Sequence, residues 1–83
     1  MPARQVHAGS TRRFCAHAAH DGPPGRRIIE EAGFEAAALA FVETWHPPAD
    51  MRGEVSVIVT DQDSGKQQCF RIDLETGEAG ACE

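Results

Sequence analysis

The side chains best suited to chemistry in this sequence are the thiol and imidazoles of Cys15-x-His17-x-x-His20. Alternation along a strand would place Cys15 and His17 on the same face. Cys69 would approach them if its strand were a neighbour. Because zinc prefers about four such ligands in a tetrahedron, we consider a zinc site at Cys15, His17, His20 and Cys69. The competing interpretation is a surface histidine pair beside a half-buried thiol, since the spacing matches no standard zinc motif.

Other chemical motifs are incomplete. A nucleophile made of Cys15 and His17 would need an electropositive, enclosed setting. Residues 61–65 (DQDSG) begin like a calcium loop, but the glycine comes one place early and Ile72 stands where the loop requires glutamate. Residues 64–66 (SGK) lack the upstream glycine of a P-loop. We therefore expect no enzymatic activity, and no cofactor other than the zinc of the first hypothesis.

Charge is unevenly distributed along the chain, whose formal net charge is -5. Residues 1–27 contain five arginines and one aspartate, whereas residues 28–83 contain three basic and twelve acidic residues. The uneven charge permits an anion site or a plain solvated surface with a basic leader. The candidates for binding a small anion or a nucleotide are Arg12, Arg13, Arg26 and Arg27. An acidic chain is a poor general ligand for nucleic acid, so we expect no nucleic-acid partner.

The length of 83 residues allows a single domain. Hydrophobic residues make up 41% and charged residues 25%, which is ordinary for a soluble globular protein. No apolar run approaches the roughly 20 residues of a membrane span, and no secretion signal is recognisable. We expect a cytoplasmic protein without membrane contacts, in which Cys15, Cys69 and Cys82 are reduced.

Hydrophobic periodicity predicts the elements that would position these side chains. An apolar stripe from Phe34 to Trp45 predicts one amphipathic helix, which Pro47-Pro48 ends. Alternation predicts strands over residues 11–20, 54–60 and 67–74, and the β-branched run Ile28-Ile29 predicts another over residues 26–32. The order β-β-α-β-β predicts an α+β fold in which one helix covers one face of a four-stranded, mainly antiparallel sheet. We expect a flexible arm at 1–10, the domain at 11–78 and a tail at 79–83.

This arrangement leaves one face of the sheet uncovered. The rows 55/57/59 and 70/72/74 would meet the helix, and the intervening side chains would point away from it. Open faces and edge strands are common recognition surfaces. We therefore expect a non-enzymatic module that binds another protein or a second copy of itself. The candidate interface residues are Ile58, Cys69, Arg71 and Leu39, the last of which lies off the apolar stripe of the helix.

Three segments resemble a known family. Residues 13–17 (RFCAH), 30–38 (EEAGFEAAA) and 63–78 (DSGKQQCFRIDLETGE) are similar to a family of small, uncharacterised alphaproteobacterial proteins. The resemblance implies a bacterial cytosolic protein of unknown function. Residues 31–37 also resemble the strand-to-helix transition of HicB-like antitoxin domains. The chain lacks their Pro-Asp-Leu-Pro-Gly-Cys-type segment, so this second likeness implies a shared local structure and not a function.

Overall fold

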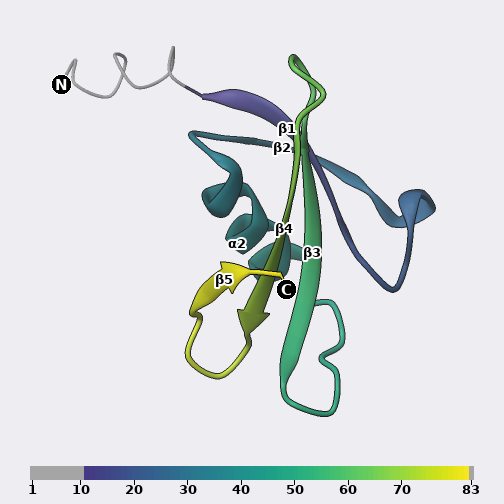
Figure 1. The fold of residues 1–83 in the computed structure, drawn as a ribbon, viewed down its shortest axis with the longest axis vertical. Coiled ribbons are helices and arrows are strands. Elements are labelled where there is room, and N and C mark those ends of the chain that lie inside the picture. The colour runs from purple at the N-terminus through teal and green to yellow at the C-terminus, as the bar shows by residue number, and fades with distance from the viewer. Residues whose placement is uncertain (1–10, 83) are drawn as a thin grey trace, which may run out of the picture.

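The computed structural model describes residues 11–82 and contains one α-helix and five β-strands within them. The strands are β1 (Arg12–Ala18), β2 (Arg27–Glu31), β3 (Glu54–Asp61), β4 (Gln67–Asp73) and β5 (Ala79–Ala81). The helix is α2 (Phe34–Trp45), and a short 3-10 turn, η1 (Pro23–Gly25), separates β1 from β2. Figure 1 shows the sheet close to edge-on, with α2 on one side of it.

All neighbouring strands pair antiparallel in the order β2-β1-β3-β4-β5. The α+β class and the single helix agree with the prediction, but the predicted number of four strands is wrong. The fifth strand lies in the segment expected to be a tail, where Ala79 pairs with Ile72 and Ala81 with Phe70. An Ala-Gly-Ala strand has no alternation of polar and apolar side chains, so it carries no pattern from which a strand is predicted.

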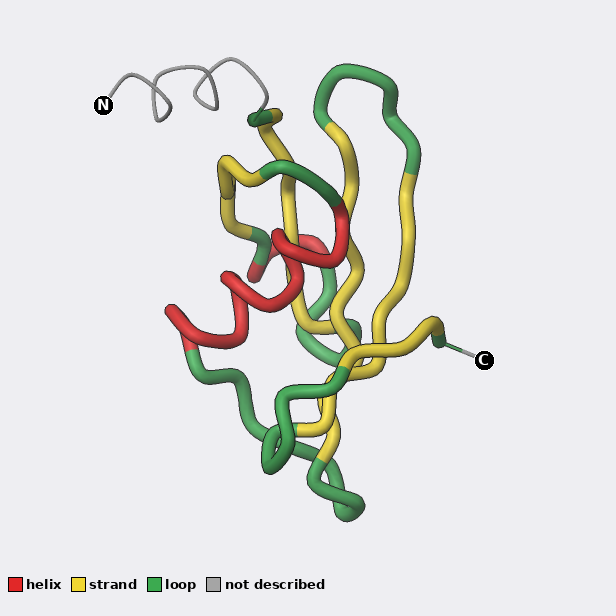
Figure 2. The backbone as a smooth tube through the Cα atoms, turned by 90° about the vertical axis from the view of Figure 1, so that its left-hand side faces the viewer, coloured by secondary structure: helices red, strands yellow, loops and turns green. Residues whose placement is uncertain are grey.

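The helix has the predicted bounds of residues 34–45. It ends at His46, which adopts a left-handed conformation with φ of 46° and donates its backbone N–H to the carbonyl of Val42 at 2.9 Å. Two prolines follow and prevent continuation. Figure 2 views the sheet from the helix side, where α2 lies in front of the strands. Among residues 11–82, no second α-helix is present to cover the opposite face.

The core lies between this helix and the sheet. Phe14, Val57 and Val59 are fully buried, and the ring centroids of Phe14 and Phe34 lie 5.1 Å apart. The expected rows of β3 and β4 face the helix, with one exception at the end of β4. Leu74 is 39% exposed because β4 ends at residue 73. The other buried residues of this core are Ala16, Ala18, Ile29, Val55 and Ile72 of the sheet and Ala37, Ala38 and Phe41 of the helix.

Trp45 does not extend the core as the apolar stripe predicted. It is 40% exposed and packs its ring against Phe41, with centroids 5.6 Å apart. The guanidinium of Arg27 lies over the indole at 5.8 Å. Trp45 therefore closes one end of the helix–sheet interface through a cation–π contact with β2.

The turn between β3 and β4 is built on a buried carboxylate. Asp61 is 2% exposed, and its Oδ1 accepts hydrogen bonds from the N–H groups of Asp63 at 2.9 Å and Ser64 at 3.4 Å. Gly65 supplies the positive φ of 78° that the turn requires. The calcium-like spacing of residues 61–65 is thus accounted for by local turn hydrogen bonds.

Candidate functional site

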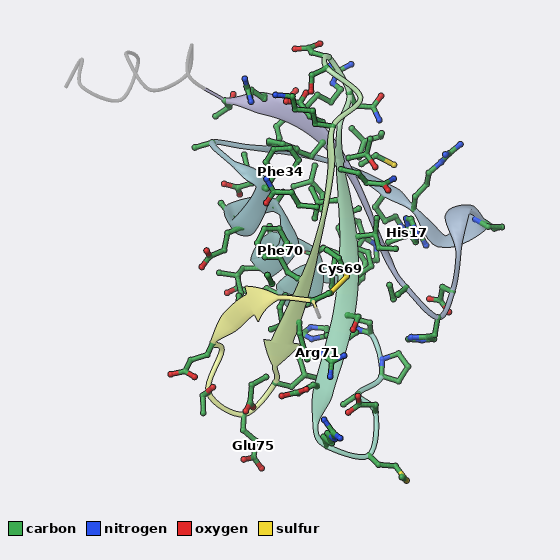
Figure 3. All side chains as sticks on the ribbon, viewed as in Figure 1. His17, Phe34, Cys69, Phe70, Arg71 and Glu75 are labelled. Carbon is green, nitrogen blue, oxygen red and sulfur yellow. A yellow bond between two sulfur atoms is a disulfide. The ribbon has the colours of Figure 1, made fainter. Side chains whose placement is uncertain are left out.

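The uncovered sheet face carries the side chains that alternation assigned to it. Cross-strand pairs join Cys15 to Thr60, His17 to Ile58 and Ile58 to Cys69, so these side chains share one face. Figure 3 shows His17 on the opposite side of the sheet from Phe34 and Phe70. We call this surface, formed by Arg13, Cys15, His17, Ile28, Glu30, Glu54, Ser56, Ile58, Thr60, Cys69, Arg71 and Cys82, the open face.

A continuous row crosses the middle of the open face. It runs from His17 on β1 through Ile58 on β3 to Cys69 on β4, and Cys69 is bonded to Cys82 beyond β5. The two cysteine Cα atoms lie 5.3 Å apart, and the N–H of Cys82 donates to the carbonyl of Cys69 at 3.0 Å. Ile28 adds a 54% exposed side chain on β2. Apart from the imidazole of His17, the centre of the open face is therefore apolar.

The disulfide corrects the expectation that all three cysteines are reduced. Cys15 alone is free, and it is buried at 6% exposure. Cys69 and Cys82 are equidistant from the 75–76 peptide bond in the middle of the β4–β5 turn, so a symmetric hairpin necessarily places them opposite each other. That symmetry was the signal in the sequence.

The structure does not bring the proposed zinc ligands together. Strand β3 separates Cys15 and His17 from Cys69, whose sulfur is already bonded. His20 lies past the end of β1, where its Nε2 is 3.5 Å from Oδ1 of Asp21. Among residues 11–82, no three cysteine, histidine or carboxylate side chains are grouped so as to hold a metal ion.

The four expected interface residues do not form one surface. Ile58, Cys69 and Arg71 lie on the open face, whereas Leu39 lies on the helix and packs against the edge of the core on the other side of the sheet. Arg71 donates from Nη1 to Glu54 at 3.4 Å. Its Nε is buried without a hydrogen-bond partner. Leu39 therefore belongs to a separate surface.

The four arginines proposed to bind an anion are also dispersed. Arg12 pairs with the buried Asp61 at 3.0 Å, and Arg13, on the other face of β1, lies 3.6 Å from Glu30. Arg27 lies at the opposite end of β2 over an indole ring, next to Arg26. Because two of the four already face carboxylates, the structure contains no concentrated positive site made of these residues.

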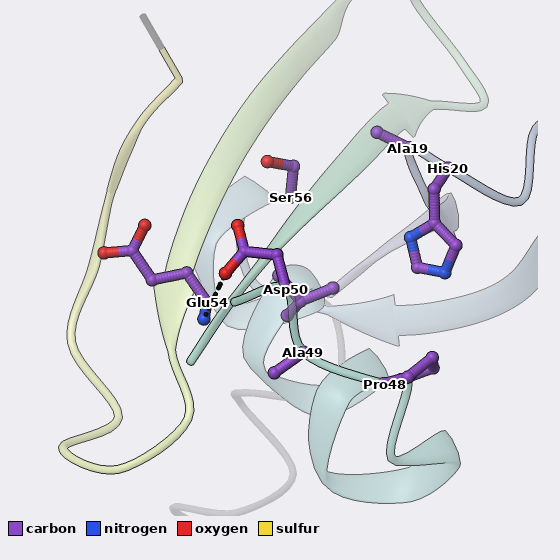
Figure 4. A pocket seen from close by; sticks show the side chains of 8 residues that line it. Ala19, His20, Pro48, Ala49, Asp50, Glu54 and Ser56 are labelled. Atoms are coloured by element: carbon purple, nitrogen blue, oxygen red, sulfur yellow. Dashed lines mark hydrogen bonds between the residues drawn. The ribbon is translucent and has the colours of Figure 1, made fainter. Parts of the chain in front are cut away.

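A shallow hollow of about 420 Å³ lies at the start of β3, where the loop after the helix meets the turn after β1. Its polar lining comes from His20, Asp50, Glu54 and Ser56 (Figure 4). The backbone N–H groups of Glu54 and Arg52 donate to Oδ1 of Asp50 at 3.0 and 2.8 Å. These hydrogen bonds lower the pKa of Asp50 below its usual 3.8. The Asp50 carboxylate therefore stabilises the loop that leads into β3.

This hydrogen bonding predicts a pH-dependent contribution to stability. Since the folded-state pKa is lowered, the ionised carboxylate stabilises the fold above about pH 4, and this contribution disappears as the pH falls through the folded-state pKa. Asp50→Asn should therefore lower the melting temperature at neutral pH, and the difference from the wild type should shrink in acid. Asp63→Asn, in the β3–β4 turn, is the control of equal charge change. A melting-temperature difference between the wild type and Asp50→Asn that stays constant down to pH 2 would contradict a stabilising role for the ionised carboxylate.

Comparison with known proteins identifies a family for this chain but no activity. The profile of a family described as "Family of unknown function (DUF5961)" matches residues 12–83. No curated protein and no solved structure matches the chain. The match agrees with the expected family of unknown function, and it tests neither the alphaproteobacterial origin nor the HicB-like likeness. The only α-helix within residues 11–82 has 12 residues and is too short to cross a bilayer.

Proposed function

Since the chain belongs to DUF5961, a family of unknown function, we propose from its structure that it is a self-associating module whose open faces pack against each other. The observation that carries the proposal is the apolar row across a sheet that is covered on one side only. A second sheet packed on such a face is the arrangement of a β-sandwich. The occupant we propose is a second copy of this chain.

The apolar content of the open face supports an interface. Ile58 is only half-buried although it lies on the central strand of five, and the disulfide beside it adds an uncharged, rigid contact. Interface centres are depleted in charged residues. His17 is the only ionisable side chain in this row. Covering the row with a partner would bury apolar surface that the helix cannot reach.

The symmetry of the face favours a second copy over an unrelated partner. Because β3 is the middle strand, a twofold axis in the plane of the interface and through Ile58 would place each sheet over the other. Charges at the two ends of the face are paired within the chain, Arg13 with Glu30 and Arg71 with Glu54. Two copies would therefore meet without an excess of like charge at either of these pairs.

The size of the face fits a modest dimer. Strands about 4.8 Å apart that rise about 3.3 Å per residue give a five-stranded sheet of roughly six-residue strands a face of about 24 by 20 Å. Because side chains make the surface uneven, its solvent-accessible area is larger than this flat area. Standard interfaces bury about 800 Å² per partner, so the open face is large enough for a modest dimer interface.

Native mass spectrometry of the untagged, oxidised protein at high micromolar concentration tests the proposal. We expect a dimer, and we expect Ile58→Asp to weaken it at least about tenfold, because two buried like charges would face each other. Ile28→Asp, at a 54% exposed position on the same face, should also weaken the dimer. Circular dichroism would verify that both variants remain folded.

Met51→Asp is the matched control, because Met51 is fully exposed in the loop before β3 and is not one of the residues that form the open face. A wild-type monomer at this concentration would refute self-association, and equal loss of dimer in the control would refute the open face as the interface. The same spectra, recorded before and after a chelator, test the zinc hypothesis separately. A bound zinc lost together with the dimer would show that a metal, and not the apolar row, holds the copies together.

A further inference from the structure

An apolar groove lies on the other side of the sheet, between the helix and the turn after β4. Leu39 and Val42 of α2 form one wall, and Ile72 and Leu74 form the other. The groove has a volume of about 370 Å³. Leu74 is 39% exposed, and Leu39 is partly buried against the edge of the core. Aliphatic side chains from two elements therefore remain accessible to a ligand at this position.

The rim of the groove is acidic. Glu43, Asp73 and Glu75 line it, and no basic side chain does. Among residues 11–82, neither Glu43 nor Glu75 has a cation partner in any described ion pair. Asp73 is partly engaged by its own turn, since its Oδ1 accepts from the N–H groups of Glu75 at 2.8 Å and Thr76 at 3.3 Å. Figure 3 shows Glu75 projecting away from the sheet into solvent.

From this combination we infer that the groove binds a basic amphipathic peptide segment of a partner protein, with leucine-like anchors between flanking lysines or arginines. Apolar anchors that enter a groove beside a helix are a common mode of peptide recognition. Complementary charge at the rim steers the encounter and orients the segment. Carboxylates that have no cation beside them repel anions and nucleic acid, which excludes those ligand classes.

This site is independent of the proposed self-association. The groove is built from α2 and the β4–β5 turn, whereas Ile58 and the disulfide face the opposite side of the sheet. A dimer formed through the open faces would leave both grooves exposed. Binding at the groove should therefore survive Ile58→Asp.

Fluorescence anisotropy with a labelled synthetic peptide tests the inference. The probe carries leucines at i and i+4 of an amphipathic sequence, with lysine and arginine at the remaining positions. We expect saturable binding to the wild-type protein that weakens as salt is added. Two control peptides, one with glutamate in place of the basic residues and one with serine in place of the leucines, should not bind.

Three variants test whether peptide binding depends on the groove or only on the net charge of the protein. Glu75→Lys should weaken binding about fivefold, because one attraction becomes a repulsion. Asp63→Lys makes the same change in net charge at the other end of β4 and should leave the dissociation constant unchanged. Leu74→Ser should weaken binding by a similar factor or more, because it removes an exposed apolar contact without opening the core.

The inference is overturned if the basic peptide fails to bind the wild-type protein. It is equally overturned if Asp63→Lys weakens binding as much as Glu75→Lys does, since net charge alone would then explain the affinity. If Ile58→Asp abolishes peptide binding while Leu74→Ser does not, the peptide occupies the open face and the groove is not its site.

Discussion

Phe14→Ala is expected to lower the free energy of unfolding by about 3–5 kcal/mol, the usual cost of removing a fully buried aromatic side chain. Phe14 is 0% exposed on β1 and packs against Phe34 of the helix. It is the largest of the fully buried side chains, so its removal leaves a cavity between the helix and the sheet. A domain of this size has only about 4–12 kcal/mol of total stability. The variant should therefore lose at least about a quarter of the total stability.

Urea denaturation followed by circular dichroism measures this loss. Ile28→Ala is the control, because Ile28 is 54% exposed on the opposite face of the sheet and its loss opens no cavity in the core. We expect that control to change the free energy of unfolding by less than about 1 kcal/mol. A Phe14→Ala variant as stable as the control would show that the helix does not pack on β1 as described.

Removal of the disulfide by Cys69→Ser with Cys82→Ser is expected to cost about 3 kcal/mol. The bond closes a loop between cysteines 13 residues apart, and loops of about this length are stabilised by roughly that amount through the restricted unfolded chain. Strand β5 has three residues, and its cross-strand partners lie on β4 alone. The bond therefore supplies much of what holds β5 in the sheet.

Urea denaturation with and without dithiothreitol tests this prediction. Reductant should destabilise the wild type to the level of the double variant and should not affect the double variant itself. Cys15→Ala is the control for the remaining thiol, which is buried and free, and its sensitivity to reductant should match that of the wild type. Intact protein whose mass and stability do not respond to reductant would contradict the bond.

Part of the open face was predictable because it depends on alternation within single strands. The prediction placed Cys15 and His17 on one side of β1, and Ile58 on the corresponding side of β3. Successive side chains along a strand point to opposite faces regardless of what lies beside the strand. The composition of the open face therefore followed from local pattern, and the helix bounds followed from a helical period ended by two prolines.

The convergence of the candidate ligands was not predictable in the same way. Whether Cys69 meets His17 depends on strand order, and β3 lies between their strands. The segments β1 and β3 are paired across more than 40 intervening residues in places, such as Cys15 with Thr60. No local pattern encodes such a pairing, because it is selected by the burial of the whole core.

The acidic groove also combines a feature visible in the sequence with one that depends on tertiary structure. Its members Leu39 and Leu74 are far apart in sequence. Periodicity placed Leu39 off the apolar stripe of the helix and Leu74 in the strand row that meets the helix. Only the packing of the helix against the end of β4 makes them neighbours. The acidic bias of residues 28–83 was visible from the start, but its concentration around an apolar groove is a consequence of tertiary structure.

Local sequence by itself determined the helix, the alternation of four strands, the turn chemistry around Asp61 and the side chains of the uncovered sheet face. Each depends on interactions between residues close in the chain. The β4–β5 hairpin and its Cys69–Cys82 bond are also local in the chain, but Ala-Gly-Ala has no alternation that would predict the strand. The tertiary structure alone decided the strand order and the separation of Leu39 from the open face. These features depend on which distant segments bury apolar surface together, and that choice is made by the free energy of the whole domain.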